Sequence, residues 1–114
     1  MHELAVCQGL MGQLEQLSER EHAQRITVIR LRIGPLSGVE PSLLRDAFPI
    51  AAAGSCAADA ELHIEPAPVR VRCTQCGAET EARVNRLLCA ACGDYRTQLI
   101  SGDELLLVSV ELER

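Results

Sequence analysis

Two pairs of cysteines constrain this chain more than any other feature of its sequence. Cys73 and Cys76 form one C-x2-C pair, Cys89 and Cys92 form another, and a glycine follows each pair. Two residues between cysteines let one tight turn aim both sulfur atoms at a common point, and glycine provides the backbone freedom that such a turn needs. The two pairs together predict a tetrahedral four-thiolate metal site, with Zn–S distances of about 2.3 Å.

The residues around the cysteines favour structural zinc over the alternative, iron in a rubredoxin-like site. Tyr95 is the one aromatic residue near the pairs. Four protein ligands leave no position for water or substrate, so no catalysis is expected at this metal. Between Arg70 and Arg96 the arginines outnumber the acids by two, while four thiolates with one Zn(II) carry a net charge of about −2. We therefore interpret the arginines as counter-charges for the site rather than a surface for nucleic acid.

Composition limits the remaining possibilities. The chain of 114 residues is long enough for one compact domain with a small appendage, and its low aromatic content of 2% predicts a core of Leu, Ile, Val and Ala. The net charge of −5 disfavours binding to nucleic acid or to an anionic membrane. No apolar run predicts a membrane span, and the first residues lack the pattern of a secretory signal. We expect a cytoplasmic protein whose thiols stay reduced and bind metal.

Hydrophobic periodicity predicts two helices and three strands outside the cysteine module. We expect helices at Leu4–Leu17 and Glu40–Ala53, and strands at Arg25–Ile33, Ala60–Glu65 and Glu104–Glu113. The alternation in the last strand changes phase, which predicts a β-bulge near Val108 and Ser109. The element order predicts an α+β fold, in which two helices cover a three-stranded sheet and a zinc-ribbon-like module is inserted before the last strand. The corresponding domains are residues 1–68 with 99–114, and residues 69–98.

The other cysteines and histidines have simpler interpretations. Cys7 lies on the apolar stripe of the first helix and is expected in the core, whereas Cys56 has no ligand-like spacing. His22 is expected to interact with a helix C-terminus, and His63 to face solvent. No nucleophile–base pair, phosphate-binding loop or paired carboxylates occur, so we do not expect an enzyme.

The first three residues, Met1, His2 and Glu3, form a second potential metal site. The amine of Met1, the deprotonated amide nitrogen of His2 and its imidazole can form fused five- and six-membered chelate rings, which place three nitrogen atoms in one plane. Such a set suits Ni(II) or Cu(II) better than tetrahedral zinc. The fourth corner remains for Glu3, through its carboxylate or amide, or for another ligand. Because histidine is second rather than third, this corner stays exchangeable, which suits a protein that must release its metal.

These features together resemble the HypA family of hydrogenase nickel-incorporation proteins. The resemblance rests on Met1, His2 and Glu3 at the start of a helix, on the stretch 33–40 (IGPLSGVE), and on the paired cysteines before a final strand. It implies a nickel metallochaperone with an α/β nickel-binding domain and a zinc domain. It also implies two partners, a HypB-type GTPase and the hydrogenase large subunit.

Residue by residue, the resemblance implies nickel binding at Met1, His2 and Glu3. It implies zinc binding at the four cysteines: Cys73, Cys76, Cys89 and Cys92. Glu40 is a candidate carboxylate in the outer shell of the nickel site. We therefore expect transferable Ni(II) at the N-terminus and structural Zn(II) in the inserted module. The alternatives are a zinc-ribbon interaction or regulatory module, in which the N-terminus has no role, and an iron electron carrier.

Overall fold

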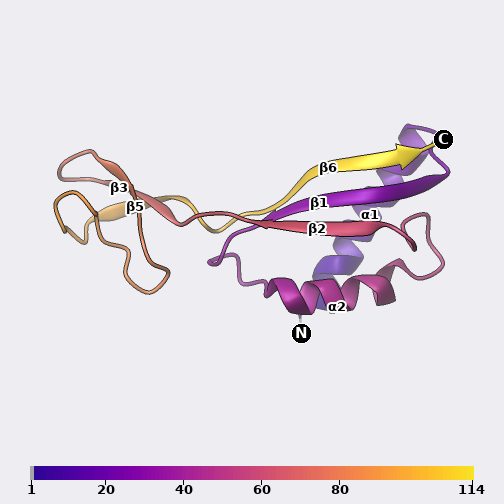
Figure 1. The fold of residues 1–114 in the computed structure, drawn as a ribbon, viewed down its shortest axis with the longest axis horizontal. Coiled ribbons are helices and arrows are strands. Elements are labelled where there is room, and N and C mark those ends of the chain that lie inside the picture. The colour runs from indigo at the N-terminus through magenta and orange to yellow at the C-terminus, as the bar shows by residue number, and fades with distance from the viewer. Residues whose placement is uncertain (1) are drawn as a thin grey trace.

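The computed structural model describes residues 2–114 and contains two helices and two three-stranded sheets. In chain order the elements are α1 (His2–Arg20), β1 (Arg25–Ile33), α2 (Pro41–Ala52), β2 (Glu61–Pro66), β3 (Arg70–Cys73), β4 (Glu79–Glu81), β5 (Thr97–Ser101) and β6 (Leu105–Glu113). Figure 1 shows both helices packed at one end of the molecule with β1, β2 and β6, while β3 and β5 lie at the opposite end. The chain is elongated, with principal extents of 53 × 28 × 17 Å.

The larger sheet has the strand order β2-β1-β6, with β1 in the centre. β1 runs parallel to β2 and antiparallel to β6. Arg30 pairs with Ser109 and the next residue, Leu31, pairs with Leu107, so Val108 is an extra residue in β6. The predicted β-bulge is therefore confirmed, and it explains why the alternation of apolar residues changes phase within one strand.

The hydrophobic core lies between the helices and one face of this sheet. α1 buries a stripe that includes Cys7, Met11 and Leu14, and α2 buries Leu44 and Phe48. β1 contributes the apolar residues Ile26, Ile29, Leu31 and Ile33. The spacing of the helical residues places them on one side of each helix, as amphipathic patterning requires. The structure confirms the α+β fold, and it confirms Cys7 as a core residue.

The opposite face of the larger sheet carries exposed charged residues, with the exposed Leu106 beside Arg32. Arg30 on β1 forms an ion pair with Glu111 on β6 at 2.8 Å, and Arg32 forms one with Glu65 on β2 at 2.6 Å. These pairs are exposed and join neighbouring strands across the sheet, where each contributes a few tenths of a kcal/mol to about 1 kcal/mol. The helices therefore cover only one face of the sheet. On the other face, charged pairs lie where a second layer of helices would otherwise pack.

α1 extends beyond its expected ends to His2 and Arg20, and His22 closes its C-terminal end. His22 adopts a left-handed conformation with φ 55°, the amide of Ala23 donates to the carbonyl of Ser18 at 2.9 Å, and the amide of His22 donates to Glu19 at 3.2 Å. This pair of hydrogen bonds is a Schellman motif, which closes a helix by satisfying its last carbonyl groups. The polar residues 18–20, which lack apolar periodicity, thus continue the helix by one turn.

A narrow connection between the two sheets lies where β1 ends. We call this connection, formed by residues 34–36 and 102–104, the waist. The amide of Gly34 donates to the carbonyl of Glu104 at 2.8 Å, and the amide of Leu36 donates to Gly102 at 2.7 Å. A Cβ atom at Gly34 would lie 2.1 Å from the carbonyl oxygen of Gly102, so only glycine fits there. Beyond the waist, β3 is the central strand of the smaller sheet, whose order is β4-β3-β5. None of the helices within residues 2–114 is both long and apolar enough to cross a membrane.

Candidate metal centres

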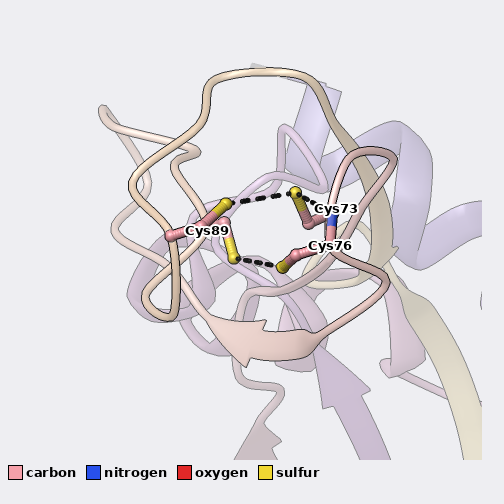
Figure 2. A group of neighbouring side chains, drawn as sticks. Cys73, Cys76 and Cys89 are labelled. Atoms are coloured by element: carbon pink, nitrogen blue, oxygen red, sulfur yellow. Dashed lines mark hydrogen bonds between the residues drawn. The ribbon is translucent and has the colours of Figure 1, made fainter.

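The four cysteines of the two C-x2-C pairs meet at one point beside the smaller sheet. Their sulfur atoms all lie within 4.8 Å of one another, and two of the separations, Cys73 to Cys92 and Cys76 to Cys89, are 3.6 Å. Figure 2 shows Cys73, Cys76 and Cys89 with their sulfur atoms turned toward a common centre. A tetrahedral ion with Zn–S bonds of about 2.3 Å requires S–S separations of about 3.8 Å. The cluster therefore has the size of a four-thiolate metal site.

The two cysteine pairs are held by turns of the same construction. The amide of Gly77 donates to the carbonyl of Cys73 at 3.0 Å, and the amide of Gly93 donates to the carbonyl of Cys89 at 2.8 Å. Both glycines have positive φ, 76° and 79°. The carbonyl of Arg96 connects the two turns, because it accepts hydrogen bonds from the amide and hydroxyl of Thr74 at 2.9 and 2.7 Å. The local sequence thus builds two equivalent halves of one site.

Backbone amides near the sulfur atoms prepare the site for a cation. The amides of Cys92 and Ala91 lower the pKa of Cys89 to about 6 despite its burial. The amide of Cys76 likewise lowers the pKa of Cys73. For Cys92 the amide of Asp94 lowers the pKa, but hydrogen bonding to the sulfur of Cys73 and partial desolvation of the thiol outweigh it and raise the pKa to about 12. A bound dication would displace the remaining protons, so metal binding at this site releases protons.

The charged residues near the cluster are partly paired with each other. Arg72 forms an ion pair with Glu79 at 2.8 Å, and Arg96 forms one with Asp94 at 2.9 Å. Asp94 and Arg96 lie two and four residues after Cys92, and the carboxylate of Asp94 also accepts the amide of Arg96 at 2.8 Å. These two arginines therefore serve local structure in this module rather than forming an open basic patch.

The start of α1 is in contact with the loop that connects β1 to α2. The imidazole Nε2 of His2 contacts the carbonyl oxygen of Gly38 and lies 3.3 Å from Oε2 of Glu3. The Glu3 carboxylate is buried and accepts the amide of Glu40 at 3.3 Å. Hydrogen bonds to this carboxylate, including the one from the amide of Glu40, lower the pKa of Glu3 to about 2, so the buried carboxylate is ionised at neutral pH. Met1, the remaining residue of the expected nickel site, lies outside the described residues.

The surroundings of His2 and Glu3 differ from the sequence expectation for Glu40 and include one contact that was not expected. The carboxylate of Glu40 accepts the hydroxyl of Ser42 at 3.1 Å, so Glu40 contacts the site through its backbone amide. The contact of Gly38 with His2 was not anticipated, because 36 positions separate the two residues. Its one sequence signal is the Ser37-Gly38 dipeptide, which is typical of a turn but does not identify what the turn approaches.

Among residues 2–114, the four cysteines are the only group of three or more potential metal-binding side chains close enough to share an ion. Cys7 is buried, and its thiol lies 3.6 Å from the carbonyl of Leu44. Cys56 is half-buried and packs against the core. His63 is exposed on β2, where Nε2 lies 3.6 Å from Glu61. These residues have structural surroundings that account for them without a metal.

Comparison with known proteins agrees with this arrangement over almost the whole chain. Residues 1–112 match the sequence model of the HypA family, described as hydrogenase/urease nickel incorporation, metallochaperone. The hydrogenase maturation factor HypA of Nitrosospira multiformis is 46% identical over 112 residues, which cover 98% of this chain and 97% of the relative. The corresponding factor of Aquifex aeolicus is 40% identical over 113 residues, with 99% and 98% covered.

The fold is also similar to solved structures. The solution structure of the Ni metallochaperone HypA from Helicobacter pylori aligns with a TM-score of 0.72 at 26% identity, covering 99% of this chain and 98% of that one. A second solution structure of a HypA protein aligns with a TM-score of 0.75, also at 26% identity, covering 98% and 96%. Sequence, fold and the four-cysteine cluster agree, and the chain belongs to the HypA family of nickel metallochaperones.

Proposed function

We propose that this protein carries Ni(II) at its N-terminus and delivers it for the maturation of [NiFe]-hydrogenase. Membership of the HypA family supports the class of function. The observation that carries the site assignment is the position of His2, which is half-exposed at the start of α1 and held by the loop before α2. An exposed chelate at the end of a chain can be approached by an acceptor protein, whereas a buried one could not release its cargo.

In this proposal the nickel ligands are the amine of Met1, the amide nitrogen and imidazole of His2, and one group of Glu3. The carboxylate of Glu3 already binds the amide of Glu40 inside the protein. The fourth planar corner therefore stays exchangeable, open to a group of Glu3 or to a ligand from another molecule. Three nitrogen donors in one plane suit Ni(II), a d8 ion, and disfavour hard cations such as Mg(II).

The four-cysteine cluster binds a structural Zn(II) in this proposal. Thiolate donors and the tetrahedral size of the cluster favour zinc over nickel, which prefers the planar terminus. The chain then consists of a nickel-binding part, residues 1–68 with 99–114, and a zinc-binding part, residues 69–98. It acts as a carrier rather than an enzyme, in the cytoplasm, with a HypB-type GTPase and the hydrogenase large subunit as partners.

The proposal is tested by nickel binding to the untagged protein and to two histidine variants. His2→Ala removes the imidazole, so we expect loss of tight nickel binding and of the absorption bands of square-planar Ni(II), with zinc content unchanged. His63→Ala is the matched control, because the side chain of His63 is 57% exposed, close to the 50% of His2, and lies on a different element. We expect this control to bind nickel as the wild type does.

The same experiment separates the proposal from a zinc-ribbon interaction module. That alternative predicts that the protein binds no nickel once zinc fills the four-cysteine cluster. Nickel bound equally by the wild type and His2→Ala would move the site away from the N-terminus. Failure of the untagged wild type to bind nickel at all would refute the carrier function itself.

A further inference from the structure

The environment of the His2 imidazole defines which of its nitrogen atoms carries the proton. Nε2 faces two oxygen atoms, the carbonyl oxygen of Gly38 and Oε2 of Glu3. A carbonyl group accepts hydrogen bonds and cannot donate one, and an ionised carboxylate is also an acceptor only. Both contacts are therefore favourable only when Nε2 carries a hydrogen atom. In a neutral imidazole this leaves the lone pair on Nδ1.

Nδ1 is also the atom that a chelate at the chain terminus must use. A ring that contains the metal, the amide nitrogen of His2, its Cα, Cβ and Cγ, and Nδ1 has six members and is unstrained. Nε2 lies on the far side of the imidazole ring from Cβ, so it cannot close a chelate ring with the amide nitrogen of the same residue. The hydrogen bond to Gly38 and the chelate therefore require the same tautomer, and they use opposite edges of the ring.

We propose that the carbonyl oxygen of Gly38 positions His2 for nickel by accepting the Nε2 hydrogen and leaving Nδ1 free for the metal. This inference rests on the proposed function of the N-terminus. Hydrogen bonds of this kind from the second nitrogen of a metal-binding histidine orient the ring and raise its basicity. A backbone carbonyl is suited to this task, because it has no proton of its own and its position depends on the path of the loop.

The loop around Gly38 is built to hold this carbonyl in place. Gly38 has φ +81°, a conformation that β-branched residues rarely adopt, although a Cβ atom there would meet no other atom within 4 Å. The hydroxyl of Ser37 accepts the amide of Val39 at 3.2 Å, and the amide of Leu36 is bonded to Gly102. The residue after Val39 donates its amide to Glu3. The loop thus contacts both residues of the N-terminal site that the structure describes.

A variant with an unfavourable backbone conformation tests the proposal. Gly38→Val adds a β-branched side chain at positive φ, so the loop must change its path and the carbonyl must move away from Nε2. We expect the affinity for nickel to fall by about 10- to 100-fold, the range found when outer-shell partners of metal ligands are lost. Zinc content should not change. Gly38→Asn should recover most of the lost affinity, because asparagine tolerates this region.

Gly54→Val is the matched control for strain. Gly54 has φ +75°, no atom within 4 Å of an added Cβ, and a position in the loop between α2 and β2. The substitution therefore introduces a similar conformational cost away from His2, and nickel affinity should stay at the wild-type value. Equal losses in Gly54→Val and Gly38→Val, or in Gly38→Asn and Gly38→Val, would overturn the assignment.

The tautomer of His2 separates the two possible roles of Gly38. If Gly38 only supported the fold, its substitution would not change which nitrogen of His2 carries the hydrogen. In ¹⁵N NMR spectra of the neutral, nickel-free protein, we expect His2 of the wild type to carry its hydrogen on Nε2. In Gly38→Val we expect a mixture of both tautomers. An Nδ1–H tautomer in the wild type overturns the proposal even if Gly38→Val fails to fold. If His2→Ala abolishes nickel binding but Gly38→Val binds normally, this inference fails while the proposed function stands; if His2→Ala binds nickel normally, the proposed function fails first.

Discussion

Removal of one ligand from the four-cysteine cluster should unfold the smaller sheet and leave the larger sheet folded. Besides the cysteines, the segment 69–101 buries only Val69 and Val71 among its apolar residues. Burial of two valine side chains contributes about 3–6 kcal/mol. A structural zinc ion contributes about 10–16 kcal/mol in small zinc modules, so the proposed zinc would be the larger source of stability. We therefore expect Cys73→Ala to lose zinc and the order of residues 69–101 together.

The larger sheet should lose less stability in this variant. β6 reaches β1 only after the segment 69–101, so an unfolded segment must be closed as a loop of about 33 residues. The entropy of this closure amounts to about 3 kcal/mol. Because domains of this size have unfolding free energies of about 5–15 kcal/mol, the helices and the larger sheet should remain folded. We expect their melting temperature to fall by roughly 12–24 °C.

Metal analysis after dialysis against a chelator and amide hydrogen exchange measure the two effects separately. In Cys73→Ala the amides of β3 and β5 should lose protection, while those of β1 at Ile29 and Leu31 should remain protected. Cys56→Ala is the matched control, since Cys56 lies outside the cluster and should not affect zinc. Retention of zinc in Cys73→Ala, or loss of protection in both sheets at once, would refute this account of what stabilises each part.

Three further predictions concern the core, a buried thiol and the chain terminus. Leu44→Ala should lower the free energy of unfolding, measured in urea, by about 3 kcal/mol, because Leu44 is 0% exposed. Leu43→Ala, at a residue that is 51% exposed, should change this free energy by less than about 0.5 kcal/mol. Equal effects would mean that α2 packs through another face. Burial and the Glu3 carboxylate raise the pKa of the Cys7 thiol above its ordinary value of 9.0, so at pH 8 iodoacetamide should modify Cys7 more slowly than Cys56 in the folded protein but not in denaturant. Because the folded-state pKa is raised, the stability linked to this thiol is present below pH 9 and lost above it, and a Cys7→Ala variant should show a weaker decline of unfolding free energy with alkaline pH. A glycine added before Met1 makes histidine the third residue, so that four nitrogen atoms can fill the nickel plane. The transfer of nickel from this variant to a competing chelator should become slower. Transfer at the wild-type rate would contradict the role given to the exchangeable corner.

Periodicity predicted the larger sheet and its helices well because each of these elements buries one side. β1 alternates between core residues such as Ile29 and Leu31 and charged residues such as Arg30, so its pattern indicates both its type and its orientation. The bulge at Val108 was predicted for the same reason, since an apolar strand that keeps one face buried can change phase only by inserting an extra residue. The end of α1 was not predicted, because the left-handed conformation of His22 has no strong signature in a residue that is not glycine.

The smaller sheet and the surroundings of His2 were much harder to predict. The strands β3, β4 and β5 have only three to five residues each, too few for a periodic pattern. The cysteine spacing nevertheless predicted the cluster, because a ligand set depends on two local turns rather than on the sheet. The contact between His2 and Gly38 depends on the packing of α1 beside the loop before α2, a tertiary arrangement that no local pattern in one sequence encodes.

The waist at Gly34 and Gly102 also determines how freely the length of the inserted segment can vary. The inserted segment begins at Val69, after β2, and ends at Gly102, before β6, and a Cβ atom at Gly102 would lie 3.0 Å from the Cα of Val69. Because the two ends touch, the geometry of β2 and β6 does not depend on how many residues the chain uses between them. A shorter turn or a longer metal-binding segment could occupy the same place. The waist is therefore a natural position for exchanging one module for another while the two-helix sheet keeps its form.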